Sequence, residues 1–294
     1  MTLLIQTAIL GLLAGGVYAL MSSGFTLVFG VMRVMNLSHA ALVIVAAFLS
    51  WWIWDTSGLD PLLAGLVVTP VMYAVGWLIY KTVVARVHRV DPELALVASF
   101  GVAVASEGVL ALVWGTSSRT STPSYFNASF HLGDVVVPQA QLYAAAGAVA
   151  MLGLLVALLR GTFVGRAIRA CATNREGALL VGIDVERTQA QMFAIGAATT
   201  GFGGGALSVL YQFVPDSQDI WIGRILCVVI LGGLGSLWGA GLGAAVLGLG
   251  EAFTASYIDT RWATAVPYFL IIAILVLRPQ GLLGRRTRAD AATA

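Results

Sequence analysis

The sequence predicts an all-α protein that crosses a membrane several times, and three observations lead to this prediction. Of the 294 residues, 59% are hydrophobic and only 10% are charged, and the mean hydropathy is +0.91. A soluble domain carries about 25% charged residues. Several runs almost free of charge are also long enough to cross a bilayer, which takes about 20 residues per helix. We therefore expect a polytopic helical protein with eight or nine membrane segments in one domain, residues 1–294.

Six apolar runs are the clearest membrane segments. They are Leu3–Val31, Leu37–Trp54, Leu62–Tyr80, Leu94–Trp114, Leu142–Leu159 and Met192–Tyr211. Three further runs are short, and two of them contain several glycines, so the count stays at eight or nine: Ile225–Leu234, Trp238–Gly250 and Ala263–Leu277. The first charge of the chain is Arg33. Since a secretory signal begins with a basic region, we expect the first run to be a retained membrane segment.

Basic residues between these runs predict the side of the membrane on which each connection lies. Lys and Arg are concentrated in cytoplasmic loops. Here they occur in the island 161–189 and at Lys81, Arg86, Arg89, Arg278, Arg285, Arg286 and Arg288. We expect these parts in the cytoplasm, with a disordered basic tail over 285–294. The connections 55–60 and 115–141 then lie outside, where Ser117–Gln139 is expected to form an ordered loop or a short hairpin.

The segment 161–189 is a polar island in an apolar chain. Two sets of residues recur there at helical spacing, one polar and one apolar: Arg166, Arg169, Thr173 and Glu176, and Ile168, Ala172 and Leu179. This pattern predicts one amphipathic helix from Arg166 to Leu180. Gly182 is expected to end it, and Asp184 to cap the next helix. Such a helix outside the bilayer needs a partner, either lipid headgroups or a soluble protein.

Glycines occur where helices can touch. Gly11 with Gly15, and Gly201 with Gly205, are four residues apart, which favours close helix packing in lipid. Another group clusters in the sequence GGLGS between two short apolar runs: Gly232, Gly233, Gly235 and Ser236. This cluster predicts a broken or re-entrant helix. Such backbone is buried in protein or lines a cavity, so a role in a cavity and plain tight packing are both open.

Polar side chains within the apolar runs are candidates for a solute pathway. Glu107 is the one acidic residue that we place well inside an apolar run. Because a carboxylate at that depth is costly, we expect it either to face a cavity or to be hydrogen-bonded between helices. The further candidates are Tyr18, Thr26, Asn36, Ser38 and His39. Asn36 is expected to cap the second helix, with a role in the pathway or its gate as the alternative.

The sequence argues against several kinds of chemistry. A Walker A loop needs a lysine after glycine to reach the phosphates, but the single lysine, Lys81, follows Tyr80. The three histidines are far apart, and no HExxH or GxSxG motif occurs. A net charge of +2 on dispersed arginines does not indicate a nucleic-acid partner. We therefore expect no enzyme activity, no metal and no bound cofactor in this chain.

Four blocks, in order along the chain, carry a resemblance to a known family. They are GGVYALMSSGFTLVFGVMRVMNLSHA, GRAIRACATNREGALLVGIDVERTQAQMFAIGAATTGFGGGAL, VILGGLGSLWGAGLGAAVLG and RPQGLLG. Together they resemble the LivH-type permeases of branched-chain amino acid ABC importers. The resemblance implies a lipid-embedded permease of the bacterial cytoplasmic (inner) membrane. It also implies a LivM-like second permease, LivG-like and LivF-like ATPases that bind ATP and Mg, and an extracytoplasmic solute-binding protein.

The resemblance also suggests residues that couple the permease to its ATPases. These are Gly165, Arg166, Arg169, Ala170, Asn174, Ala178, Gly182 and Ile183. The implied solutes are branched-chain or related amino acids. Because the family also resembles importers of urea and amides, such solutes are an alternative. A channel or ion-driven carrier that works without partners is a second alternative, and it predicts solute flux through the purified chain alone.

Overall fold

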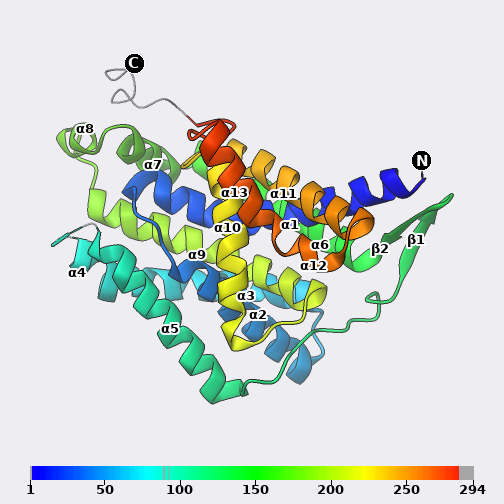
Figure 1. Ribbon diagram of the computed structural model, residues 1–294. Coiled ribbons are helices and arrows are strands. Elements are labelled where there is room, and N and C mark those ends of the chain that lie inside the picture. The colour runs from blue at the N-terminus through cyan, green and yellow to red at the C-terminus, as the bar shows by residue number, and fades with distance from the viewer. Residues whose placement is uncertain (1, 89, 92, 285–294) are drawn as a thin grey trace.

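The computed structural model describes residues 2–88, 90, 91 and 93–284 (Figure 1). Arg89, which the sequence analysis placed among the cytoplasmic basic residues, lies outside these ranges. The same holds for the tail 285–294 with its three arginines, for which the sequence analysis predicted disorder.

Seven helices of the described chain are long and apolar enough to cross a membrane. They are α1 (Thr2–Met32), α2 (Ser38–Ser57), α3 (Pro61–Ile79), α5 (Leu94–Trp114), α6 (Gln139–Gly161), α9 (Val185–Leu210) and α11 (Leu237–Tyr257). Helix α3 continues through a π-helical turn, η1 (Tyr80–Val84), into α4 (Ala85–His88). Two shorter helices are α10 (Gln218–Gly232) and the apolar α13 (Val266–Leu277). Each predicted apolar run therefore corresponds to a helix, which confirms the all-α polytopic fold.

The remaining elements are short and lie between these helices. They are β1 (Ser129–Leu132), β2 (Val135–Pro138), α7 (Phe163–Thr173), α8 (Arg175–Leu180), η2 (Pro215–Ser217) and α12 (Thr260–Ala263). Strands β1 and β2 pair antiparallel, with Ser129 opposite Pro138. The hairpin predicted within Ser117–Gln139 is therefore confirmed.

Helix α9 lies at the centre of the bundle, and 89% of its membrane-spanning stretch is buried. It packs on α1, α2 and α3. Its small residues allow this, because a Cβ at Gly201 would overlap the backbone of Thr69, and one at Gly204 would overlap that of Ala47. Such close approach increases van der Waals packing between helices. This packing holds helices together in lipid, where there is no hydrophobic driving force between them.

Helices α1 and α11 pack through a second set of small residues. A Cβ at Gly15 would lie 2.8 Å from the carbonyl oxygen of Ala244, and one at Gly248 would overlap the carbonyl oxygen of Gly11. The contact that we predicted for the Gly11 and Gly15 pair is thus confirmed.

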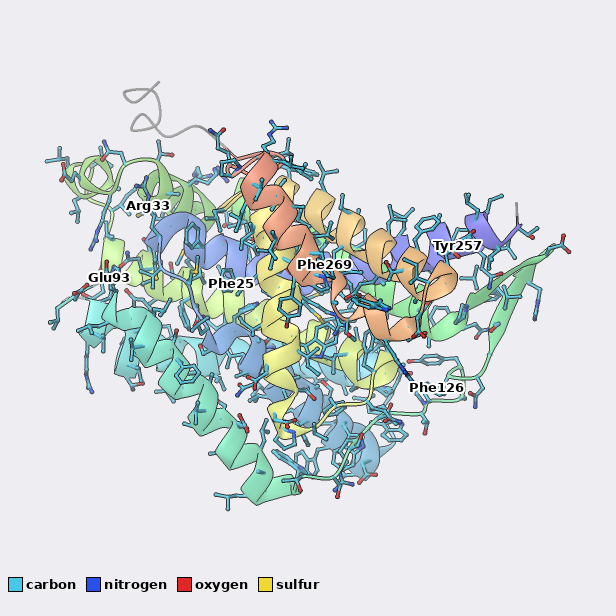
Figure 2. All side chains as sticks on the ribbon, in the orientation of Figure 1. Phe25, Arg33, Glu93, Phe126, Tyr257 and Phe269 are labelled. Carbon is cyan, nitrogen blue, oxygen red and sulfur yellow. The ribbon has the colours of Figure 1, made fainter. Side chains whose placement is uncertain are left out.

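The molecule has two distinct polar ends. Figure 1 shows α4, α7 and α8 at one end and the β1–β2 hairpin with the N-terminus at the other. In Figure 2, Arg33 and Glu93 lie toward the first end, and Phe126 and Tyr257 toward the second. This arrangement agrees with the predicted sidedness, in which the arginine-rich connections share one side. We call the first the cytoplasmic end and the second the external end.

Candidate functional site

A group of side chains joins α1, α10, α11 and the end of α9 within the bundle. We call it the polar cluster: Tyr18, Tyr211, Trp221, Arg224 and Glu251. Arg224 Nε donates to Glu251 Oε1 over 2.8 Å, and the Tyr18 hydroxyl donates to Glu251 Oε2 over 2.6 Å. The two phenol oxygens of Tyr18 and Tyr211 are 3.0 Å apart. The carboxylate therefore has a partner on each oxygen.

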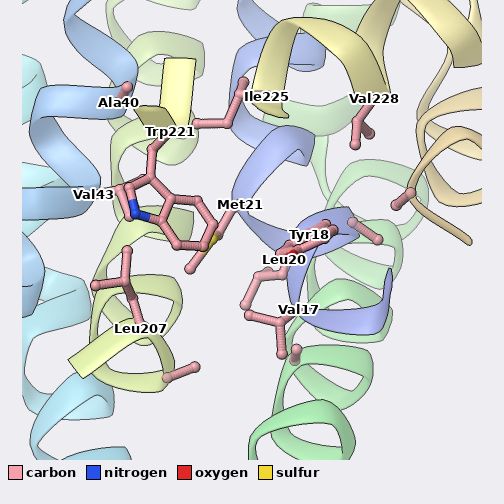
Figure 3. Close-up of a cluster of buried hydrophobic side chains, with 14 of the residues drawn as sticks. Val17, Tyr18, Leu20, Met21, Ala40, Val43, Leu207, Trp221, Ile225 and Val228 are labelled. Atoms are coloured by element: carbon pink, nitrogen blue, oxygen red, sulfur yellow. The ribbon is translucent and has the colours of Figure 1, made fainter. Parts of the chain in front are cut away.

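Aromatic rings pack against this ion pair. The guanidinium of Arg224 lies 4.9 Å from the ring centroid of Trp221, and Trp221 meets Tyr18 edge to face at 6.0 Å. Figure 3 shows Tyr18 and Trp221 among the buried apolar side chains around them. Such contacts stabilise a cation that has lost most of its water. Charged groups at membrane depth that are paired in this way mark solute pathways by default.

Our sequence analysis named only Tyr18 of this cluster as a candidate, and it missed both charged members. Glu107 was named as the one acidic residue well inside an apolar run, and this was wrong because Glu251 lies within α11. Arg224 was missed because the apolar run was started one residue after it. The signal in the sequence was a single basic and a single acidic residue on two successive apolar segments.

Glu107 itself is hydrogen-bonded between helices. Its Oε2 accepts a hydrogen bond of 2.7 Å from Nε2 of Gln218, the first residue of α10. The side chain is half-buried on α5. Of the two roles left open for Glu107, this contact supports the hydrogen-bonded link between helices.

The candidates near the start of α2 are buried and satisfied. His39 Nε2 lies 2.8 Å from the carbonyl oxygen of Met21, and the Ser38 hydroxyl donates to Asn36 Oδ1 over 2.6 Å. The prediction that Asn36 caps α2 was wrong, since Asn36 Oδ1 accepts no backbone N–H there. The Leu37 N–H instead donates to Ser99 Oγ of α5 over 3.0 Å, so a tertiary contact replaces the local cap.

The GGLGS sequence forms the turn between α10 and α11. Gly233 and Gly235 adopt φ angles of 97° and 83°, and Ser236 accepts a hydrogen bond from Gly239 N to cap α11. Gly232 packs directly on Gly239. The predicted break is therefore present. It separates two helices, and Gly235 within it packs on Gly30 of α1.

A cavity of about 730 Å³ opens beside this turn. Its lining includes Phe29, Gly30, Arg33, Gly235 and Gln280. Arg33 has φ of 54°, which makes it the one residue other than glycine with a positive φ in the described chain. This conformation strains an L-residue, and strained backbone of this kind clusters at switch regions. The sequence FGVMRVMN and the turn GGLGS thus meet at the cytoplasmic end.

The polar island contains two helices where we predicted one. Asn174 ends α7 and caps α8, because its Oδ1 accepts a hydrogen bond of 3.0 Å from Gly177 N. Asparagine competes for backbone donors in this way, which makes it a better cap than an interior helix residue. The two other predictions for the island are confirmed. Gly182 follows α8 with φ of 81°, and Asp184 caps α9 by accepting from Arg187 N.

The break at Asn174 changes which residues of the island face outward. On α7, Ile168 is buried and Arg166 and Arg169 are exposed, as predicted, but Ala172, which was expected on the buried side, is exposed. Beyond the break, Leu179 was expected on the buried side but is 56% exposed. Leu180 and Val181 are 89% and 75% exposed. We call Leu179, Leu180 and Val181 the apolar tip of α8.

The other residues implied for coupling differ in exposure. Gly165 and Ala178 are buried, Ala170 and Ile183 are half-buried, and Asn174 and Gly182 are exposed. Gly165 is the tightest of these positions, since a Cβ there would overlap the carbonyl of Leu159. Arg169 donates to the same carbonyl. Helix α7 is therefore held firmly to the end of α6.

A cavity of about 290 Å³ connects the island to the pathway candidates. Thr26 from α1, Arg169 from α7, and Gly235 and Trp238 at the start of α11 all line it. The guanidinium of Arg160 faces the Trp238 ring at 5.7 Å. Residues from three separate sequence blocks thus meet in one place. A displacement of α7 would therefore change the cavity that α7 shares with α1 and the GGLGS turn.

Within residues 2–284 that are described, no three His, Cys, Asp or Glu side chains are grouped so that they could hold a metal ion. Cys171 and Cys227 are both free thiols and both buried.

Residues 7–275 match the family described as the permease component of the branched-chain amino acid transport system. The chain belongs to this permease family. The permease is 30% identical to the high-affinity branched-chain amino acid transport system permease protein LivH of Escherichia coli, over 94% of each chain. It is 28% identical to the corresponding protein BraD of Pseudomonas aeruginosa, over 96% of each. It is 26% identical to the probable LivH of Methanocaldococcus jannaschii, over 90% of this permease and 88% of the relative. No solved structure is significantly similar to it.

Proposed function

We propose that this permease is the membrane subunit of an ATP-driven importer that moves branched-chain or related amino acids into the cytoplasm. Its membrane is the bacterial cytoplasmic (inner) membrane. The observation that carries the proposal is the α7–α8 segment, which lies outside the membrane-length helices and ends in the exposed apolar tip of α8. An exposed apolar patch bordered by charged residues is typical of a protein interface.

The partner that fits this surface is an ATPase. Arg166, Arg169 and Arg175 are exposed on the same α7–α8 segment as the apolar tip, so the segment offers both apolar contact and positive charge. A groove of about 410 Å³ runs between α7 and α8, lined by residues that include Asn174, Gly177 and Val181. Lipid headgroups are the alternative partner, and the co-purification described below distinguishes the two.

The proposal includes further subunits, which the likeness to LivH-type permeases supports. A LivM-like permease pairs with this chain in the membrane, and LivG-like and LivF-like ATPases bind ATP and Mg on the cytoplasmic side. A solute-binding protein delivers amino acid at the external end. When the ATPases bind nucleotide, they move α7 and α8. Because Arg169 of α7 shares a cavity with Thr26 and Gly235, this movement shifts α1 and α11, which open and close the pathway.

The experiment is co-purification of the chain with its co-encoded ATPases, together with the ATPase rate of the assembled importer. Arg166→Glu with Arg169→Glu, and separately Leu180→Ser, are expected to weaken assembly and to lower stimulated ATP hydrolysis about tenfold or more, because charge reversal at an interface costs several kcal/mol. Arg261→Glu is the matched control, since this exposed arginine lies in α12 at the external end. Assembly and stimulation that stay unchanged in the α7 and α8 variants refute the coupling surface.

A further inference from the structure

Arg224 uses only part of its hydrogen-bonding capacity. Its Nε donates to Glu251, and the guanidinium rests on Trp221. Nη1 and Nη2, with four N–H bonds between them, donate to no residue of the described chain, and neither nitrogen is sealed in the interior. About 14% of the Arg224 side chain remains exposed. The planar end of the guanidinium is therefore open to an acceptor.

This open end lies at membrane depth. Glu251 is six residues before the end of α11 at Tyr257, which corresponds to about 9 Å along the helix axis. Tyr18, which also contacts Glu251, lies near the middle of α1. Unpaired N–H groups at such depth are costly unless a solute or water reaches them. A link between helices needs only the Nε contact, so the two free nitrogens require another explanation.

We propose that Arg224 and Glu251 form a binding site for the zwitterionic head of an α-amino acid. The two terminal nitrogens of Arg224 match the two oxygens of a carboxylate, which guanidinium binds in a bidentate manner. Glu251, 2.8 Å away, keeps further lone pairs on both oxygens for an ammonium group. A cation and an anion side by side match the carboxylate and ammonium that an amino acid carries on one carbon.

An apolar side chain on this amino acid suits the surroundings of the ion pair. Trp221 lies against the guanidinium and Tyr18 donates to Glu251, and the neighbouring α10 residues Ile225 and Val228 belong to the same buried apolar cluster. Neutral solutes such as urea gain little from a cation, so the site favours amino acids over the urea and amide alternatives. The inference rests on the proposed import function and specifies its substrate class.

The experiment uses the assembled importer in lipid nanodiscs, with the full chain alone as a second sample. The melting temperature is measured with L-leucine and with L-leucinol, which keeps the ammonium and the side chain but lacks the carboxylate. A ligand that binds the folded state raises the melting temperature. We expect leucine to stabilise the wild type and leucinol to have little effect. Arg224→Lys keeps the charge but loses the bidentate guanidinium. It is expected to raise the leucine concentration needed for the same increase in melting temperature about tenfold or more.

Two further variants separate binding from folding. Arg224→Gln combined with Glu251→Gln leaves no unpaired charge in the cluster, and it is also expected to lose the leucine response. Arg119→Lys is the matched control, because Arg119 also stacks on a tryptophan, Trp51, but lies outside the polar cluster. Arg119→Lys is expected to respond to leucine as the wild type does.

Three results would overturn the inference. The first is a wild type that does not respond to leucine in either sample. The second is an equal response to leucine and leucinol, or one that survives Arg224→Lys. The third is loss of the second permease from the Arg224→Lys assembly with the leucine response intact, which would assign the free nitrogens to that protein. Each can occur while the α7–α8 coupling test succeeds, so the proposed function is judged separately.

Discussion

The hydroxyl of Tyr18 on α1 donates a 2.6 Å hydrogen bond to the Glu251 carboxylate on α11, whose other oxygen holds Arg224 of α10. Three helices that are distant in sequence therefore share one carboxylate. Removing one member leaves the others desolvated without a full set of partners, which costs more than the pair contributes in net stability.

Replacing members of the polar cluster should destabilise the protein by different amounts. We expect Glu251→Leu to lower the free energy of unfolding by about 3–5 kcal/mol, because Arg224 then loses its counter-ion. Tyr18→Phe should cost about 1–3 kcal/mol, since one carboxylate oxygen loses its donor. Denaturant unfolding of the purified chain measures both changes. Equal stability of Glu251→Leu and the wild type would mean that the ion pair does not form.

The contact between α1 and α11 should not tolerate even a methyl group. Gly248→Ala is expected to lower stability by about 1–3 kcal/mol, because the new Cβ would overlap the Gly11 carbonyl oxygen and overpacking forces the helices apart. Gly101→Ala on α5 is the control, since a Cβ there meets nothing within 4 Å. It should be neutral or stabilising by about 0.5–1 kcal/mol. The two melting temperatures should therefore move in opposite directions or at least differ clearly.

Asn174 should matter through its cap. Asn174→Ala removes the acceptor for Gly177 N and should destabilise α8 by about 1 kcal/mol. Asn174→Asp keeps an acceptor and should restore the helix. Amide hydrogen exchange over residues 175–180 reports the opening of α8 directly, and faster exchange is expected in the alanine variant alone. Identical exchange in all three proteins would show that the cap does not hold α8.

The thiol of Cys171 should react slowly at neutral pH. This side chain on α7 is only 5% exposed, and burial raises the pKa of its thiol above the ordinary value. A raised thiol pKa means that the neutral, unreactive form persists to higher pH than in free cysteine. In a Cys227→Ser background, we expect maleimide to label the folded chain more slowly than the denatured chain at pH 7–8. The labelling rate of the folded chain should also keep increasing at pH values above the ordinary pKa of a thiol. A labelling rate equal to that of the denatured chain would contradict the burial of α7 against α9.

Much of the fold was predictable because its signals are local. Apolar length identifies each membrane segment, and the clustered arginines identify the island, since neither depends on what the segments later contact. The caps at Asp184 and Gly182 were also predictable, because the donors and acceptors lie within a few residues. The cap predicted at Asn36 was wrong because a local signal does not show contacts with other helices. The Leu37 N–H at the start of α2 donates to Ser99 of α5 instead.

The sequence by itself determined the all-α membrane fold, the order of its segments and the polar island, because hydrophobic length and charge are properties of each stretch alone. Only the tertiary structure decided that α9 occupies the centre and that Arg224, Glu251 and Tyr18 meet. Those outcomes depend on which small residues let which backbones approach, and on an ion pair between two helices that becomes favourable only after both charges have been removed from water together.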